Sequence, residues 1–270
     1  SLEIGAGLFG LLGPNGAGKS SLMRTLATLQ SADSGTVQFN DLNVLQQKPQ
    51  VRQVLGYLPQ EFGVPPKMSA LKLLDYYALL KGLKNKAERK ETAEHLLQLV
   101  NLYTDRKKEV YRFSGGMKQR FGIAQALLGD PQLIIVDEPT AGLDPGERVR
   151  FNNLLSQTSE NRVVLLSTHI VDDVSSLCSQ MAIINKGQVV TSGSPKDLID
   201  ELTGHVWQKL IQQDQYQTYC DKYEVIHSKL SMGQPLIHIL SDDDPGDGFR
   251  SIEPKLDDVY FSVISNPKQA

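Results

Sequence analysis

A glycine-rich segment near the start of the chain has the residue types and the spacing of a phosphate-binding loop. Its eight residues are Gly13, Pro14, Asn15, Gly16, Ala17, Gly18, Lys19 and Ser20. They match the pattern G-x-x-x-x-G-K-[ST] in full. Glycines let backbone N–H groups converge on phosphate oxygens, and the N-terminus of a following helix adds partial positive charge. We expect Lys19 to reach the β- and γ-phosphates, Ser20 to ligate Mg²⁺ and Ser21 to hydrogen-bond the α-phosphate.

The segments on either side of this loop fit the same mechanism. Gly7–Leu12 is a short apolar run typical of a buried strand. After the loop, Leu22, Met23, Leu26 and Leu29 recur at helical spacing. A strand, a glycine loop and a helix are the context that the motif requires, so a chance glycine-rich turn before a lysine is the weaker interpretation.

Two carboxylates follow a second apolar run. Residues 133–136 predict a strand that is buried on both faces, and Asp137 and Glu138 come directly after it. Ligands bind at the carboxyl ends of strands in open α/β sheets. We expect Asp137 to bind Mg²⁺, directly or through water, and Glu138 to act as general base for an attacking water, a role worth about 10²–10⁴-fold in rate. An acidic strand end is weak evidence alone, but together with the phosphate loop it predicts a P-loop NTPase.

Further motifs stand at intervals that narrow this prediction. Residues 113–117, FSGGM, resemble the LSGGQ signature of ABC ATPases. Gln60 resembles the glutamine of the Q-loop, residues 141–144 (AGLD) resemble the D-loop, and His169 resembles the switch histidine. The resemblance covers roughly the first 200 residues, with the motifs in the family's order.

The signature segment also has a physical interpretation of its own. Ser114 is a suitable N-cap, and Gly115 and Gly116 expose backbone N–H groups at the positive end of the helix that it opens. The resemblance implies that these residues contact the γ-phosphate held by a second cassette, so that ATP lies between two cassettes. Met117 replaces the usual Gln and Phe113 the usual Leu. Methionine lacks a strong hydrogen-bonding group, so Met117 offers no replacement for the glutamine's contact with the nucleotide sugar.

The resemblance implies roles for the other motif residues as well. Gln60 is expected to ligate Mg²⁺, to contact the attacking water and to link the nucleotide to the helical insertion. His169 is expected to contact the γ-phosphate and to orient the water and Glu138. Asp144 of the D-loop is expected at the nucleotide interface. The family also stacks adenine on an aromatic residue upstream of the phosphate loop, and we expect that residue and the first edge strand to be missing. Base stacking is worth about 1–3 kcal/mol, so ATP binding should be correspondingly weaker.

An α/β architecture is needed to hold these groups. Besides the segments above, alternating patterns predict strands at residues 36–40, 54–58, 163–167, 182–185 and 188–191, with a turn at Lys186-Gly187. Ser69 should cap a helix, residues 87–102 should form another, and Ser194-Pro195 should begin one more. Residues 223–227 and 236–240 indicate strands of an accessory unit.

The predicted fold is a P-loop NTPase core with a mainly parallel sheet, helices on both faces and antiparallel edge strands. We expect an ABC ATPase domain over 1–203, a helical insertion at about 61–130 and a small C-terminal accessory region over 204–270.

Composition limits the possible partners. The formal net charge is -3, and no basic stripe is present, so nucleic acid is not an expected partner. The apolar run at residues 8–12 is far shorter than the roughly 20 residues of a membrane span. The chain should therefore act peripherally, on the cytoplasmic side of a membrane, with a second cassette (homo- or heterodimer) and a transmembrane permease. Cys178 and Cys220 lack CxxC spacing, which favours a reduced compartment.

The direction of transport depends on a short C-terminal motif. Residues 253–260, EPKLDDVY, are similar to the P-x-L-E-D-V-Y ending of exporter cassettes for drugs, antibiotics and polysaccharides. Phe62 and Met68 bound a segment that either receives a coupling helix or packs the helical lobe. Asp242, Asp243 and Asp244 are expected in a solvated turn, and the remaining histidines receive no role: His95, His205, His227 and His238.

Three alternatives remain. An importer subunit would differ in its permease and would depend on a solute-binding protein. A soluble ABC ATPase that acts on nucleic acid or ribosomes usually carries two cassettes or a long coiled coil, and this chain has neither. A regulatory cassette that binds ATP without hydrolysing it is disfavoured by Glu138 and His169.

Overall fold

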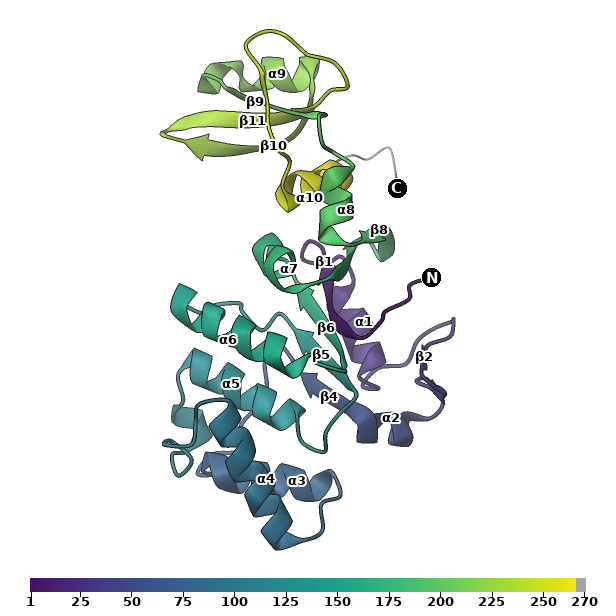
Figure 1. Cartoon of the computed structure of the whole chain (residues 1–270), viewed down its shortest axis with the longest axis vertical. Coiled ribbons are helices and arrows are strands. Elements are labelled where there is room, and N and C mark those ends of the chain that lie inside the picture. Colours follow the sequence, from purple (N-terminus) through teal and green to yellow (C-terminus); the bar gives the residue numbers. More distant parts are fainter. Residues whose placement is uncertain (266–270) are drawn as a thin grey trace. The chain divides into compact units, whose positions relative to one another are not determined.

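The computed structural model describes residues 1–265 and separates into two compact units (Figure 1). Unit 1 comprises Ser1–Leu11 and Gly18–His169, and unit 2 comprises Leu12–Ala17 and the chain from Ile170 onward. Within the described part of the chain, no helix is both long and apolar enough to cross a membrane.

Unit 1 contains a parallel sheet whose strands lie in the order β4 (Leu55–Leu58), β5 (Leu133–Asp137), β6 (Val163–Thr168) and β1 (Gly7–Leu12). The ladders between β4 and β5 and between β5 and β6 are parallel. Every residue of β5 is buried, which explains its continuous apolar sequence. The predicted mainly parallel α/β sheet is confirmed, and because β4, β5 and β6 are parallel, their carboxyl ends lie along one edge.

Unit 1 contains six α-helices among the described residues. They are α1 (Lys19–Leu26), α2 (Lys48–Val54), α3 (Ala70–Leu80), α4 (Lys86–Leu99), α5 (Gly115–Ala126) and α6 (Pro145–Thr158), with the 3-10 turn η1 (Val110–Arg112). Ser69 and Ser114 cap α3 and α5 as predicted, each accepting a hydrogen bond from the backbone N–H three residues later. The helix predicted over 87–102 is present as α4, which ends earlier.

The first half of unit 1 departs from the sequence prediction. The strand expected at 36–40 is reduced to β2 (Gln38–Phe39), paired with β3 (Leu42–Asn43). Helix α2 was not predicted, because Val51 is its one buried residue and a seven-residue helix shows little periodicity.

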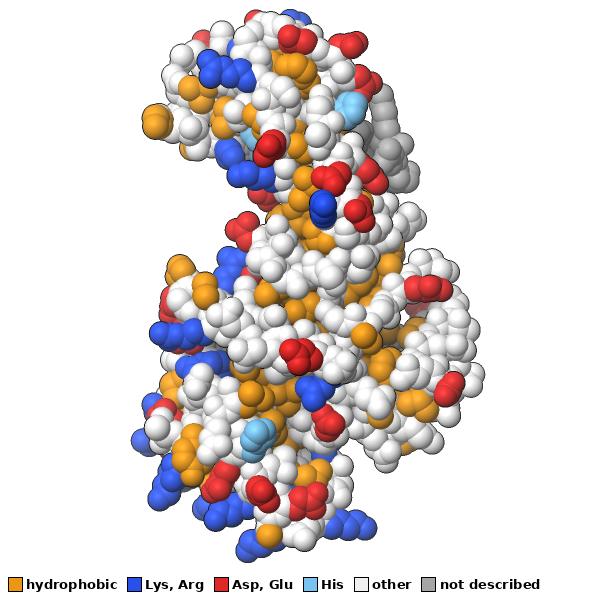
Figure 2. All heavy atoms as spheres, viewed as in Figure 1, with side chains coloured by type: hydrophobic (Ala, Val, Ile, Leu, Met, Phe, Trp, Pro, Cys, Tyr) orange, Lys and Arg blue, Asp and Glu red, His pale blue; other side chains and the backbone are white. Residues whose placement is uncertain are grey.

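Acidic and basic side chains are interspersed on the face of this unit in Figure 2.

From Ile170 onward, unit 2 contains α7 (Val171–Leu177) and the antiparallel hairpin of β7 (Gln180–Asn185) and β8 (Gln188–Gly193). The turn predicted at Lys186-Gly187 is confirmed, since both residues have positive φ, 49° and 79°. Ser194 caps α8 (Pro195–Asp200), also as predicted.

The C-terminal part of unit 2 is an antiparallel four-stranded sheet with helices. Its elements are β9 (Val206–Leu210), η2 (Gln213–Gln215), α9 (Tyr216–Lys222), β10 (Glu224–Ser231), β11 (Gln234–Leu240), β12 (Arg250–Ser251) and α10 (Leu256–Ser265). The strand order is β10-β11-β9-β12. Ile211, Ile237, Ile239 and Phe249 form its buried core. The strands expected at 223–227 and 236–240 are present in longer form, and the three aspartates at 242–244 are exposed next to a bend.

Candidate functional site

A connected group of side chains lies at the carboxyl end of β5. The Nζ of Lys19 is 3.4 Å from Oε1 of Glu138. The other oxygen of Glu138, Oε2, is 3.2 Å from Nδ1 of His169. Beside them, the hydroxyl of Ser20 donates to Oδ1 of Asp137 over 3.5 Å, a long hydrogen bond. Five residues predicted from three separate motifs are therefore brought together within unit 1.

The backbone at the end of β5 aims the two carboxylates. Asp137 is the last strand residue and pairs with Ser167 of β6. The next residue, Glu138, has a φ of 46° and donates its N–H to the carbonyl of Ser167. A left-handed conformation is uncommon for a residue other than glycine, and such positions gather at functional sites. The turn places Asp137 in a buried position while Glu138 reaches both Lys19 and His169.

The phosphate loop has the backbone that its glycines predict. Gly16 and Gly18 have φ of 81° and 103°, in the region that favours glycine. The N–H of Ala17 donates to the carbonyl of Pro14 over 3.2 Å. At Gly13 a Cβ atom would lie 2.3 Å from the carbonyl oxygen of Ile184, so only glycine fits. Asn15 of the loop is exposed, and so is Ser21, the third residue of α1.

The start of α1 can hold a polyphosphate. Gly18 precedes the helix, and no side chain caps its first turn, so the N-terminal N–H groups remain directed at a ligand position. Lys19 is the first residue of α1 and is 4% exposed, with its ammonium beside Glu138. A buried lysine next to uncapped helix N–H groups can bind several anionic oxygens at once.

The pair of Ser20 and Asp137 fits a magnesium ion. Mg²⁺ prefers oxygen ligands at about 2.0–2.1 Å in octahedral geometry, which places neighbouring ligands about 2.9 Å apart. The hydroxyl of Ser20 and Oδ1 of Asp137 are 3.5 Å apart, so a small closing movement would bring them to that spacing. Both groups are hard oxygen donors, and the donor set therefore suits Mg²⁺.

The signature residues lie at the N-terminus of α5. The hydroxyl of Ser114 accepts a hydrogen bond from the N–H of Met117 over 3.3 Å. Ser114 and Gly115 are exposed, whereas Gly116 is covered by the side chain of Glu147. Phe113 is buried and packs edge-to-face on Phe121, with ring centroids 6.2 Å apart. Phe113 therefore fills a core position, which explains why the replacement of leucine by phenylalanine is accommodated.

The other predicted residues lie on different elements. Gln60 is exposed in the bend after β4, at the entry to the helical insertion. Asp144 caps α6, since its carboxylate accepts the N–H of Glu147 over 2.9 Å. Phe62 lies against Gly122 of α5. This contact favours packing inside the helical lobe over a role in a groove for a coupling helix.

Two residues near the site escaped the sequence analysis. Burial, and then the charge of Asp137, raise the pKa of Tyr57 on β4, which lies near the carboxyl end of the sheet. Glu147 contacts Gly116 of the signature and forms ion pairs with Arg120 and Arg150. Glu147 follows the cap residue Asp144 by three positions, a spacing that in a sequence indicates helix capping alone.

Comparison with known proteins supports the nucleotide-binding site that this geometry suggests. The family described as "ABC transporter" matches residues 1–141. This chain belongs to the ABC transporter family. The ABC cassette is 37% identical over 205 residues to Nod factor export ATP-binding protein I of Cupriavidus metallidurans, covering 75% of this chain and 67% of that protein.

Two further relatives extend the comparison. Linearmycin resistance ATP-binding protein LnrL of Bacillus subtilis is 35% identical, over 73% of this cassette and 63% of that protein. The probable multidrug ABC transporter ATP-binding protein YbhF of Escherichia coli is 34% identical, over 72% of this cassette and 34% of that protein. The cassette thus spans about two thirds of the length of the first two relatives and one third of YbhF.

Solved structures agree on the fold. The ATP-binding subunit of an ABC transporter is 27% identical and superimposes with a TM-score of 0.64 over 73% of this cassette and 82% of that chain. A dimeric post-hydrolysis ATP-binding cassette bound to ADP and Pi superimposes with a TM-score of 0.65 at 24% identity, over 72% of this cassette and 88% of that chain. The ABC ATPase fold is therefore shown, and the predicted P-loop NTPase class is confirmed.

Proposed function

We propose that this ABC cassette hydrolyses Mg²⁺–ATP and energises a separate transmembrane permease, as an exporter subunit on the cytoplasmic side of a membrane. The observation that carries the proposal is the position of Glu138. Its carboxylate follows the buried Asp137 and contacts both Lys19 and His169. A carboxylate between a phosphate-binding lysine and a histidine is placed to accept a proton where a γ-phosphate would lie.

Each side chain has a separate task in this proposal. The loop N–H groups and Lys19 hold the β- and γ-phosphate oxygens, and Ser20 and Asp137 hold the metal ion. The ion neutralises charge that develops on the phosphates. When Lys19 turns to the phosphates, Glu138 is free to take a proton from the attacking water. His169 holds Glu138 in place through the contact between Nδ1 and Oε2.

The site is completed by a second cassette. Ser114, Gly115 and Gly116 open α5 and present a helix N-terminus, which binds anions. They would contact the γ-phosphate held by the second copy. Asp144 would lie at the same interface, and Gln60 would lie at the metal ion. ATP closes such a dimer because its γ-phosphate adds contacts that ADP lacks, and only a differential contact can shift the equilibrium.

Export is favoured by the relatives and by the C-terminal motif. The relatives are named for Nod factor export, linearmycin resistance and multidrug transport. The motif DDVY lies in the first turns of α10, within the C-terminal region of residues 204–270 that we propose as an accessory to the ATPase domain of residues 1–203. ATP-dependent uptake into inside-out vesicles that carry the permease supports export, and dependence on an external solute-binding protein would make the cassette an importer subunit.

The chemical step is tested by replacing Glu138 with Gln, which keeps the shape of the side chain but removes the proton acceptor. The Glu138→Gln variant should bind ATP while phosphate release falls by about 10²-fold or more. Glu160→Gln, at an exposed position in the turn after α6, is the matched control and should keep the parent rate. Near-normal turnover in Glu138→Gln would remove this residue from the mechanism.

A further inference from the structure

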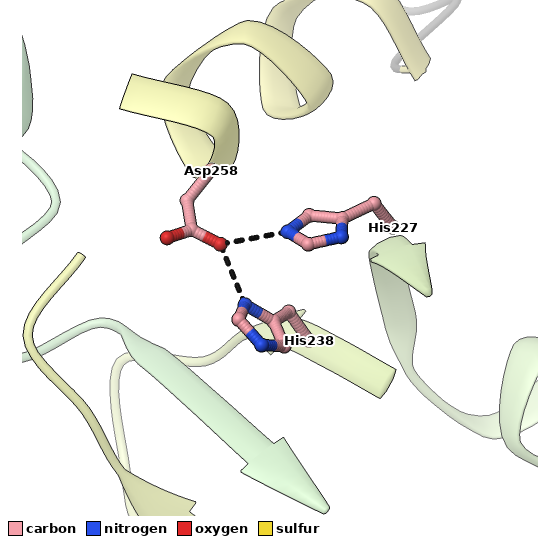
Figure 3. Close-up of side chains that lie close together, drawn as sticks. All are labelled: His227, His238 and Asp258. Atoms are coloured by element: carbon pink, nitrogen blue, oxygen red, sulfur yellow. Dashed lines mark hydrogen bonds and ion pairs between the residues drawn. The ribbon is translucent and has the colours of Figure 1, made fainter. Parts of the chain in front are cut away.

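Two histidines and an aspartate converge in the C-terminal part of unit 2. His227 comes from β10, His238 from β11 and Asp258 from α10 (Figure 3). The Nε2 of His227 is 3.0 Å from Oδ1 of Asp258, and the Nδ1 of His238 is 2.6 Å from the same oxygen. Both imidazoles therefore lie within hydrogen-bond distance of the same carboxylate oxygen.

The strands hold the two histidines side by side. His227 and His238 are register partners across the ladder between β10 and β11, next to a bulge between Val225 and His227. Their ring centroids are 4.4 Å apart and the rings are tilted by 42° rather than stacked. A bulge re-aims side chains, and here it accompanies two imidazoles whose nitrogens point at a common position.

The donor set and the spacing suit a transition-metal ion. The three ligand atoms all lie within 4.8 Å of one another. Zinc binds imidazole nitrogen and carboxylate oxygen at about 2.0–2.2 Å, which places tetrahedral ligands about 3.3 Å apart. The two nitrogens now sit 3.0 and 2.6 Å from Oδ1, so an outward shift of less than 1 Å would open that spacing. Imidazoles with a carboxylate favour zinc over magnesium or calcium, which take oxygen ligands.

The charge of the cluster favours a bound cation. Asp258 is 1% exposed, and the ion pairs that the structure gives it are with His227 and His238. Among the ion pairs of the described residues, two imidazoles and no lysine or arginine face this buried carboxylate. Burying an unbalanced charge is costly, and buried charges are normally paired or bind a metal. A divalent cation would supply the missing charge at the point where the three ligand atoms meet.

The surroundings of the cluster support a built site. The second carboxylate oxygen of Asp258, Oδ2, accepts the N–H of Lys255 over 2.7 Å, which leaves Oδ1 facing the histidines. Metal-binding carboxylates are commonly fixed in this way by a further hydrogen bond. The ring of Phe261 lies 5.0 Å from that of His227 and shields one side. The side chain of His227 is 11% exposed, so the cluster reaches the surface at this residue.

We propose that His227 Nε2, His238 Nδ1 and Asp258 Oδ1 bind one zinc ion or a similar first-row transition-metal ion, with water as the fourth ligand. Coordination shifts each imidazole to the tautomer that carries its proton on the other nitrogen, or releases a proton from an imidazolium. The ion joins α10 to the sheet through β10 and β11, and so stabilises the C-terminal region that carries the DDVY motif.

The test is a titration of the metal-stripped full chain with Zn²⁺ in excess Mg²⁺, which occupies sites made of oxygen ligands. Calorimetry should show one equivalent bound, and the thermal midpoint should rise with Zn²⁺ concentration. Co²⁺ in place of Zn²⁺ should give the intense visible absorption of a four-coordinate ion. Absence of one-to-one Zn²⁺ binding, or a weak six-coordinate Co²⁺ spectrum, would overturn the proposal and leave a hydrogen-bonded cluster without metal.

Variants locate the ion. His227→Gln, at the accessible edge of the cluster, and His238→Gln should each lower Zn²⁺ affinity by at least about tenfold. His205→Gln is the matched control, because His205 also faces an aspartate, Asp242, at 3.0 Å but at an exposed position. Circular dichroism and ATP affinity verify that each variant is folded. If both cluster variants bind Zn²⁺ as the parent chain does, the ion lies elsewhere and the proposal is wrong.

Discussion

The ammonium of Lys19 and the carboxylate of Glu138 form an ion pair of 3.4 Å at a position where both side chains are nearly buried, at 4% and 10% exposure. The two groups have opposite tasks in the proposed reaction, since the lysine binds phosphate and the glutamate takes a proton from water. In the nucleotide-free chain each compensates the other's charge. Polyphosphate oxygens offer Lys19 a stronger partner, so ATP binding itself would release Glu138 for catalysis.

The first prediction concerns the stability that this pair contributes. Lys19→Met removes one partner of a buried pair and should lower the free energy of unfolding by about 3 kcal/mol without nucleotide, because the nearly buried Glu138 loses its lysine partner. The double variant Lys19→Met/Glu138→Gln should recover much of that loss. Urea unfolding of the parent, Lys19→Met, Glu138→Gln and the double variant gives the coupling energy directly. Strict additivity would show that the two side chains do not interact.

The second prediction concerns the shared site. Lys19→Ala disables the phosphate loop of one cassette, and Ser114→Arg disables the signature of another. Each variant alone should be inactive, whereas the mixture should regain activity, since one composite site per heterodimer is intact. The rate of the isolated cassette should also depend on protein concentration through the dimerisation range. A mixture as inactive as its components, with a rate per subunit independent of concentration, would reject a composite site.

The phosphate loop, β5 and the helix cap at Ser114 could be predicted from sequence because each depends on local chemistry. A glycine pattern, an apolar run and a serine before a helix each determine the conformation of a segment only a few residues long. The family's motif order implied that His169 orients Glu138, and the rule that strand ends meet at one edge of a parallel sheet placed Asp137 and Glu138 there. The contact of Glu138 with Lys19 was not predicted. The structure places these five residues together, as the motifs implied.

The features that sequence reasoning missed depend on long-range packing. His227, His238 and Asp258 have no recognisable spacing, because a strand register and a helix bring them together. The cover that Glu147 forms over Gly116 is a contact between α5 and α6, and no local pattern predicts it. Helix α2 was missed for the opposite reason, since a short helix with one buried residue has too little periodicity to be recognised.

The third prediction concerns the two thiols. Burial, and then the charge of Asp173, raise the pKa of Cys178 to about 12. The raised pKa favours the folded chain below the unfolded value of about 8.5, and this contribution is lost as the pH rises toward 12. At pH 8 a thiol reagent should therefore modify the partly exposed Cys220 and spare Cys178 until the chain unfolds. Rapid modification in a Cys220→Ser variant would contradict the burial of Cys178.

The last prediction concerns the tight contact beneath the signature. A Cβ atom at Gly116 would lie 2.4 Å from Oε2 and 2.8 Å from Cδ of Glu147, so Gly116→Ala must displace that side chain. Glu147 cannot move freely, because it forms ion pairs with Arg120 at 3.4 Å and Arg150 at 2.8 Å. The substitution should therefore lower the free energy of unfolding by about 1–3 kcal/mol, the usual cost of overpacking.

Two further variants separate this clash from other effects of an added methyl group. Gly146→Ala is the matched control, since a Cβ there would lie 3.4 Å from Asp144 Oδ1, a contact that a small shift relieves, and stability should change little. Glu147→Ala removes the obstructing carboxylate, so Gly116→Ala should cost much less stability in that background. Urea unfolding of the single and double variants measures the difference, and an equal cost in both backgrounds would show that Glu147 is not what confines Gly116. If the double variant recovers stability but not ATPase activity, Gly116 is needed for the approach of the phosphate itself, because an alanine side chain would then stand at the helix N-terminus that receives the γ-phosphate.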